Sequence, residues 1–286
     1  MNDKDKGFNL DTLALGKATE YKSTYAPDLL QAVPRSMNRS EIEIAEALPF
    51  YGEDVWQGYE LSWLNLKGKP VVVLLKCFVP CVSPNLVESK SFKLYLNSFN
   101  QSTFQSQVEV KEILEQDLSA TAGSAVRVEL FAPDDLAAFS ASALPGKCID
   151  DLDIEITKYD LDPSLLKPEN DSDCEVSEEV AETLNSHLLK SNCLITNQPD
   201  WASVVISYTG PKICHQSLLR YLVSFRMHNE FHEQCVERIF TDLLKHCGCK
   251  ELSVQALYTR RGGLDINPFR STEPGLAAPN LRVNRQ

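Results

Sequence analysis

The order of apolar and polar residues predicts secondary structure throughout the first half of the chain. An uninterrupted apolar run at 71–78 predicts a buried strand, and the partial alternation of apolar and polar residues at 90–99 predicts a second one. We expect a helix over about 103–118 and a further strand at 125–131.

The second half predicts the same succession of elements. Strands are expected at 201–208, 218–225 and 252–258, with a turn at 260–263 after the last one. The clearest helical pattern lies between them, with an apolar face formed by Phe231, Cys235, Val236, Ile239, Phe240, Leu243 and Leu244. Each half is therefore predicted to be a β–β–α–β unit with antiparallel pairing, and the expected fold class is α+β.

A sequence repeat links the two halves. Residues 91–99 (SFKLYLNSF) and 217–225 (SLLRYLVSF) share Ser, Tyr, Leu, Ser and Phe at positions 126 residues apart. Such a repeat is a duplicated domain, and we expect domains at 1–148 and 183–286 joined by a linker at 149–182.

The copies differ where side chains could do chemistry. Glu88-Ser89-Lys90 precedes the shared core in the first copy, whereas Cys214-His215-Gln216 precedes it in the second. The second copy also carries His232-Glu233 on the helix that follows. The two halves have therefore specialised.

The net charge of −12 is concentrated in one segment. Residues 150–179 hold twelve acidic residues and two lysines, so the rest of the chain is close to neutral. This segment is predicted to be a solvated linker, with a short strand at 153–157. The acidity is therefore attributed to solubility, and neither a direct nucleic-acid partner nor a membrane partner is expected.

Composition and cysteine usage indicate a cytoplasmic protein. Hydrophobic residues make up 43% and charged residues 24% of the chain, as in globular proteins, and no apolar run approaches the roughly 20 residues of a membrane span. The N-terminus is polar, and nine cysteines, an odd number, are expected to be reduced thiols.

Cys193 is a candidate nucleophile, because a polar segment with a proline turn places it seven residues before Asp200. The thiolate is the reactive form of cysteine, and Asp200 is a candidate partner for the thiol proton. The alternative is a packing cysteine and an aspartate that caps a turn.

His232 and Glu233 could bind a planar heterocycle at the start of the helix, since a carboxylate accepts paired N–H donors. The alternative is a capped, solvated helix start, and Glu230 is expected on the surface. Lys90 and Lys93 could face a ligand anion or could protect an edge strand.

Two further patterns concern phosphate and metal. Residues 260–263 (RRGG) form either a charged turn or a phosphate cradle, and the chain contains no Rossmann or P-loop glycine motif. Cys214-His215 and His246-Cys247-Gly248-Cys249 offer metal ligands, but they lack the usual paired spacing and no metal is expected.

Four motifs together resemble one family, the queuosine-pathway nitrile reductases, which convert 7-cyano-7-deazaguanine to 7-aminomethyl-7-deazaguanine with NADPH. The resemblance is to the long two-domain form and covers nearly the whole chain. The motifs lie at 83–95 (SPNLVESKSFKLY), 193–201 (CLITNQPDW), 224–233 (SFRMHNEFHE) and 260–263 (RRGG).

The resemblance implies a fold, an assembly and a site. The fold is a tandem tunnelling fold, in which antiparallel sheets carry two helices on one face, and the assembly is a homodimer. Cys193 would add to the nitrile carbon to form a thioimide, Asp200 would transfer the proton, and two NADPH molecules would supply four electrons. The resemblance further implies substrate binding by Val87, Glu88, Ser89, His232 and Glu233, and NADPH binding by Ser89, Lys90, Arg261 and Gly262.

Two rival functions predict different behaviour. A zinc-dependent cyclohydrolase of the same fold would contain stoichiometric zinc and lose activity with a chelator. A noncatalytic ring-binding or protein-interaction module would depend on the acidic segment at 150–179 and would tolerate Cys193→Ala.

Overall fold

The computed structural model describes residues 21–44, 47–168 and 179–286. The polar N-terminus and residues 169–178 of the predicted linker lie outside this range. The chain divides into two compact units: unit 1 includes 53–140 and 260–266, and unit 2 includes 47–52, 141–259 and 267–286. The limits 1–148, 149–182 and 183–286 stay a prediction.

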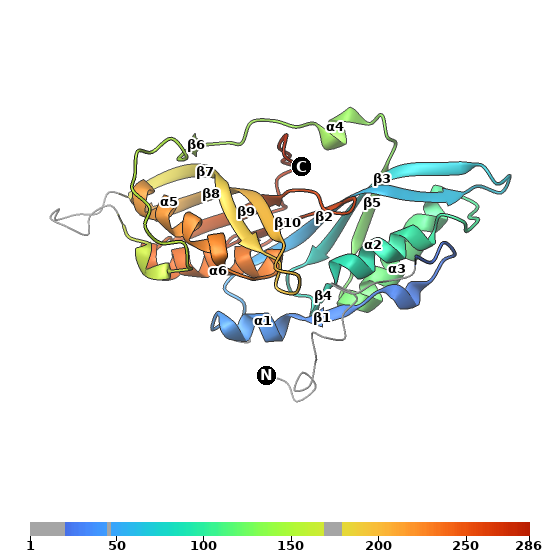
Figure 1. Cartoon of the computed structure of the whole chain (residues 1–286), viewed down its shortest axis with the longest axis horizontal. Helices are drawn as coiled ribbons and strands as arrows, with labels where there is room; N and C mark the ends of the chain where they lie inside the picture. The colour runs from blue at the N-terminus through green and yellow to red at the C-terminus, as the bar shows by residue number, and fades with distance from the viewer. Residues whose placement is uncertain (1–20, 45–46, 169–178) are drawn as a thin grey trace. The chain divides into compact units, whose positions relative to one another are not determined.

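Unit 1 is an antiparallel sheet with two helices on one face (Figure 1). The strand order is β5-β3-β2, and a separate two-stranded ladder joins β1 to β4. The strands are β1 (Ala32–Pro34), β2 (Tyr51–Leu64), β3 (Pro70–Pro80), β4 (Asn85–Val87) and β5 (Arg127–Phe131). The helices are α1 (Arg35–Glu41), α2 (Ser89–Ser98), α3 (Gln107–Ala122) and the short α4 (Leu136–Phe139).

Unit 2 repeats this plan with one more strand at each side. Its strand order is β10-β9-β8-β7-β6, antiparallel except for the parallel edge pair β6–β7. The strands are β6 (Lys147–Cys148), β7 (Glu179–Asn192), β8 (Pro199–Pro211), β9 (Glu251–Tyr258) and β10 (Leu264–Ser271), of which residues 267–271 belong to unit 2. Helices α5 (His215–Ser224) and α6 (His232–Cys247) cover one face of this sheet (Figure 1).

Alternation along the strands of unit 2 separates an apolar face from a polar one. Leu184, Ile206 and Val254 lie side by side in register and are buried. Their neighbours Thr183, Ser207 and Ser253 are also in register and point to the opposite face. We call the second set, with Ser271 opposite Ser253 on β10, the hydroxyl row.

The strands predicted at 90–99 and 218–225 are wrong, because both segments are helical. Phe92, Tyr95, Leu96 and Phe99 recur at i, i+3, i+4 and i+7, the spacing of one helix face, and all four are buried. The second copy repeats this spacing in α5. Each unit therefore has two helices packed on its sheet, α2 and α3 in unit 1 and α5 and α6 in unit 2, as the tunnelling fold requires. No strand forms at 153–157.

The repeated tyrosine holds the two helices of each unit together. The Tyr95 hydroxyl donates to Asp117 on α3 at 2.6 Å, and the Tyr221 hydroxyl donates to Asp242 on α6 at 2.6 Å. Asp117 also accepts a hydrogen bond from Tyr25 at 2.7 Å. The shared residues of the repeat are therefore structural.

The repeated serines tie each helix to the segment before it. Each hydroxyl donates to the backbone carbonyl three residues earlier and accepts a backbone N–H. The donors of these N–H groups are Gln31 for Ser91, Ala26 for Ser98, Lys167 for Ser217 and Asp162 for Ser224.

Two further observations bear on the sequence predictions. The eight cysteines that the structure describes are free thiols. Across the described residues, no helix has both the length and the apolar character that crossing a membrane requires.

Candidate functional site

The turn between β7 and β8 fixes the backbone of Cys193. Its N–H donates to the Gln198 carbonyl at 2.8 Å, and its carbonyl accepts from the Asn197 N–H at 3.0 Å. Asn197 adopts φ +56°, a left-handed conformation that asparagine tolerates. The Asn229 side chain donates to the carbonyl of Cys193 at 3.1 Å and to the side-chain oxygen of Asn197 at 3.0 Å. The backbone of Cys193, which is 8% exposed, is thus fixed both by its own turn and by Asn229.

Asp200 and His232 meet at the same end of this hairpin. Asp200 lies directly opposite Ser191 on β7, and directly paired residues point to the same face. Asp200 is 2% exposed, and its Oδ1 lies 3.5 Å from His232 Nε2. The His232 ring packs on Tyr258 with centroids 4.0 Å apart. Burial raises the pKa of Tyr258 well above its ordinary value, so its hydroxyl stays protonated beside the imidazole.

Helix α6 starts with buried acidic side chains, so the alternative of a capped, solvated helix start is wrong. Its N-cap residue Phe231 offers no side-chain cap, and Glu233 is 4% exposed. The expectation that Glu230 lies on the surface is also wrong. Glu230 is 1% exposed, because Arg238 reaches back along the helix and donates to its carboxylate from Nε at 2.7 Å.

In unit 1, three predicted substrate residues sit at the junction of β4 and α2. Glu88 is the N-cap of α2: its Oε1 accepts the Lys90 N–H at 2.8 Å, and its Oε2 accepts the Ser91 N–H at 2.7 Å. Val87 ends β4 and Ser89 begins α2. Burial raises the pKa of the Glu88 carboxyl, against the opposing effect of these hydrogen bonds. This junction therefore holds a buried carboxylate at the positive end of a helix.

The predicted cofactor residues of unit 1 gather along the same helix. Lys90 and Lys93 lie in its first turns. A Cβ added to Gly262 would lie 3.0 Å from Lys93 Cδ, so the turn at 260–263 runs against α2. Gly262 has φ +60°, which favours glycine. Cationic side chains beside a glycine turn suit a phosphate.

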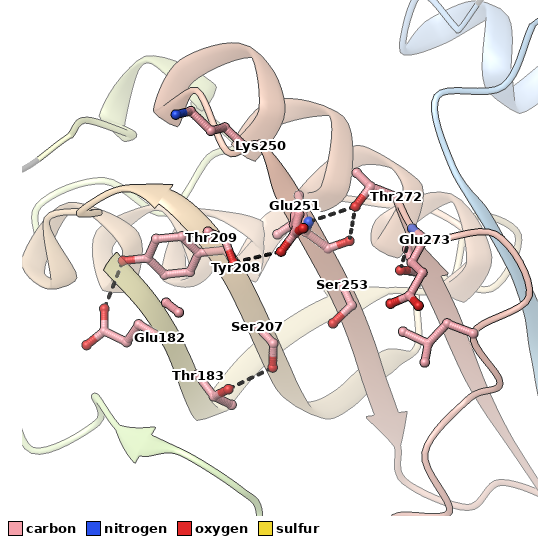
Figure 2. A pocket seen from close by; sticks show the side chains of 14 residues that line it. Glu182, Thr183, Ser207, Tyr208, Thr209, Lys250, Glu251, Ser253, Thr272 and Glu273 are labelled. Carbon is pink, nitrogen blue, oxygen red and sulfur yellow. Dashed lines mark hydrogen bonds between the residues drawn. The ribbon is translucent and has the colours of Figure 1, made fainter. Parts of the chain in front are cut away.

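A polar cavity of about 650 Å³ lies elsewhere in unit 2 (Figure 2). It opens on the hydroxyl row, where Thr183 and Ser207 are hydrogen-bonded at 2.9 Å. Thr209 donates to Glu251 at its rim, also at 2.9 Å. Within the described residues, its lining includes none of the predicted catalytic or ligand-binding residues. This cavity is therefore distinct from the candidate site.

In the two motifs considered as metal ligands, one histidine pairs with a carboxylate and two cysteines are buried. His215 Nε2 lies 3.0 Å from Glu182 Oε2, and Cys247 and Cys249 are buried. Over the part of the chain that the structure describes, these motifs supply no group of three ligand atoms.

The structure thus brings the predicted residues together in two sets. In unit 2, Asp200 lies beside His232, which Glu233 follows on α6, and Cys193 lies in the turn at the same end of the hairpin. In unit 1, residues 87–90 lie at the start of α2, and the turn at 260–263 lies against Lys93 of that helix. Sequence reasoning missed the clamp by Asn229 and the packing of Tyr258 on His232. Asn229 lies inside the motif at 224–233, but its role depends on the turn at Asn197, 32 residues away in sequence.

Comparison with protein families identifies the chain. Residues 21–130 match the family described as nitrile reductase, 7-cyano-7-deazaguanine reductase N-terminal, and residues 199–275 match the family described as QueF-like protein. The two matches, and the antiparallel sheets with helices on one face, confirm the expected tandem tunnelling fold. The chain therefore belongs to the 7-cyano-7-deazaguanine reductases, the nitrile reductases of queuosine biosynthesis.

Proposed function

We propose that Cys193 is the nucleophile of this nitrile reductase. Its thiol adds across the carbon–nitrogen triple bond of 7-cyano-7-deazaguanine, so that a C–S bond forms and the thiol proton moves to nitrogen. The product is a covalent thioimide, which divides the barrier to reduction. The observation that carries this proposal is the turn that holds Cys193 at the same end of the hairpin as Asp200.

Asp200 is proposed to move the proton. As a carboxylate it takes the proton from the thiol, and as an acid it delivers that proton to the nitrile nitrogen. Its burial and the imidazole 3.5 Å away support this role, because both restrict its side chain to one position.

The substrate ring is proposed to bind through buried acidic groups. Glu233 accepts its N–H donors, and His232 donates to its carbonyl oxygen. Val87, Glu88 and Ser89 are proposed as further substrate-binding residues. Both carboxylates are almost fully buried, so their hydrogen bonds to a ligand are little weakened by water.

NADPH is the proposed reductant, with two molecules consumed in each turnover because a nitrile needs four electrons to become an amine. It supplies hydride to carbon. The residues of unit 1 fit its phosphates: Ser89 and Lys90 begin α2, and Arg261 and Gly262 form the turn that lies against it.

The intermediate steps return Cys193 to its starting state. The first hydride and a proton convert the thioimide to a hemithioaminal. This species breaks its C–S bond, and the thiol leaves with a proton to give a free imine. The second hydride and a proton give the aminomethyl product. The enzyme is also proposed to be a cytoplasmic homodimer that needs no metal for this reaction.

Intact-protein mass spectrometry tests the proposal. Mixing wild type with 7-cyano-7-deazaguanine without NADPH should add the full substrate mass, since no atoms leave, and NADPH should discharge the adduct. Cys193→Ala should bind substrate but form no adduct, whereas the control Cys148→Ala, at an exposed thiol, should react as wild type does. An adduct that persists in Cys193→Ala would refute this assignment.

A further inference from the structure

A second group of reactive side chains lies at the edge of the unit 2 sheet. Cys148 ends β6 and pairs with Asn185 on β7. Asp150 follows two residues later, and His187 lies on β7. None of these residues belongs to the proposed reductase site.

The three side chains converge. One ligand atom from each, the thiol sulfur, a carboxylate oxygen and an imidazole nitrogen, lies within 4.8 Å of the other two. Ligand atoms around a four-coordinate zinc ion are about 3.5 Å apart, as bond lengths of about 2.0–2.3 Å require. Cys148 is exposed, so rotation of its side chain can close this difference.

Hydrogen bonds already orient two of the three ligands, Asp150 and His187. Asp150 Oδ1 accepts from the Ser186 hydroxyl at 2.6 Å, and its Oδ2 accepts from the His187 N–H at 2.9 Å. His187 Nδ1 lies 2.8 Å from the Ser203 hydroxyl, which fixes the ring and leaves Nε2 for a ligand. Outer hydrogen bonds of this kind typically hold the histidines and carboxylates of metal sites.

A β-bulge places His187 in this position. The ladder between β7 and β8 shifts register between Ser186 and Leu189, and the extra residue redirects the strand. Unit 1 has the corresponding irregularity between Gly58 and Leu61, where Tyr59 takes the place of His187 and stacks under the Arg260 guanidinium. The bulge thus belongs to the repeated fold, whereas the ligand set occurs in one copy.

We propose that Cys148, Asp150 and His187 bind a divalent transition metal ion of the zinc type. Thiolate, imidazole and carboxylate are the ligands that zinc takes, and three protein ligands leave a fourth position for water. Binding displaces the thiol proton to solvent and involves no redox change. The metal joins β6 to β7 and stabilises unit 2 by mass action, and it takes no part in nitrile reduction.

Zinc titration of chelator-treated, full-length protein tests this proposal. Competition with a chromophoric chelator should give one zinc per chain in wild type and in the control Cys214→Ala, whose thiol lies outside the group. Cys148→Ser and His187→Gln should each weaken zinc binding by at least about a hundredfold, because loss of an outer hydrogen-bond partner alone costs about 10–100-fold. Cobalt in place of zinc should give a thiolate charge-transfer band that Cys148→Ser abolishes.

Two controls make the result decisive. Metal-free Cys148→Ser should have the circular dichroism and thermal unfolding of metal-free wild type, since Cys148 is exposed. Reductase activity should be the same with and without chelator, so this proposal and the role of Cys193 can fail separately. Equal zinc affinity in wild type and both variants would overturn the metal site, as would the absence of saturable binding.

Discussion

Glu88→Gln tests the carboxylate that caps α2. In the native protein each carboxylate oxygen accepts one backbone N–H, from Lys90 and from Ser91. Glutamine keeps one oxygen and points an NH₂ group at the other N–H. The lost cap hydrogen bond leaves one buried N–H without an acceptor, which costs about 1–3 kcal/mol. We therefore expect unit 1 to lose roughly 1–3 kcal/mol of stability.

The same substitution should weaken substrate binding. A hydrogen bond to a charged group contributes about 1.5–3 kcal/mol, which corresponds to an affinity loss of about ten- to hundredfold. Burial raises the pKa of the Glu88 carboxyl, so wild-type affinity should fall with acidification at a pH above that expected for an ordinary glutamate. The affinity of Glu88→Gln should lack this step.

Hydrogen–deuterium exchange of the α2 amides measures the loss of helix stability. Calorimetric titration with 7-cyano-7-deazaguanine over a pH series measures the loss of substrate affinity. Glu112→Gln, at an exposed position on α3, is the matched control and should match wild type in both. Unchanged α2 exchange in Glu88→Gln would show that the cap contributes nothing. Unchanged affinity would remove Glu88 from the substrate pocket.

Four other substitutions test structural features of the two copies. Tyr221→Phe should destabilise unit 2 by about 2 kcal/mol, because it removes the hydroxyl that donates to the Asp242 carboxylate. Tyr95→Phe should destabilise unit 1 by less, because Tyr25 also donates to the Asp117 carboxylate. Urea unfolding that shows the reverse order would contradict this reasoning. Cys214→Ser should stabilise α5 by about 0.5–1 kcal/mol, because the N-cap of this helix has no side-chain acceptor, and a lower thermal unfolding temperature would refute it. Hydrogen bonds from the side chains of Lys158 and Ser164 lower the pKa of Asp162 to about 2. Wild type should therefore lose the stability that ionised Asp162 contributes as the pH falls from 3.8 towards 2. Unfolding scans of Asp162→Asn over this range should lack that loss of stability.

The fold class could be predicted from sequence, but two of its elements could not. The apolar run of β3 and the single apolar face of α6 each fit one kind of element. The segment at 90–99 fits both, because its apolar residues satisfy a helical spacing and also alternate in part. Its helical state depends on packing against α3 and on the Glu88 cap, and both require knowledge of the fold.

The candidate site could be predicted as residues but not as an arrangement. Cys193, Asp200 and His232 follow from motifs, and the first two are close in sequence. The approach of His232 to Asp200 depends on where α6 begins relative to the β7–β8 hairpin, which no local pattern specifies. Glu230 was misplaced for the same reason: an isolated acidic residue predicts exposure, and only the path of α6 shows that Arg238 neutralises it.

The hydroxyl row has a thermodynamic consequence for anything that binds over that face of unit 2. Association through an apolar surface changes the heat capacity strongly, because water is released from hydrocarbon. Thr183, Ser207 and Ser253 offer hydroxyls instead, so a ligand or a second chain resting on them displaces water that is hydrogen-bonded. Such association is expected to have a small heat-capacity change, and calorimetry at two temperatures can therefore distinguish it from binding at an apolar face.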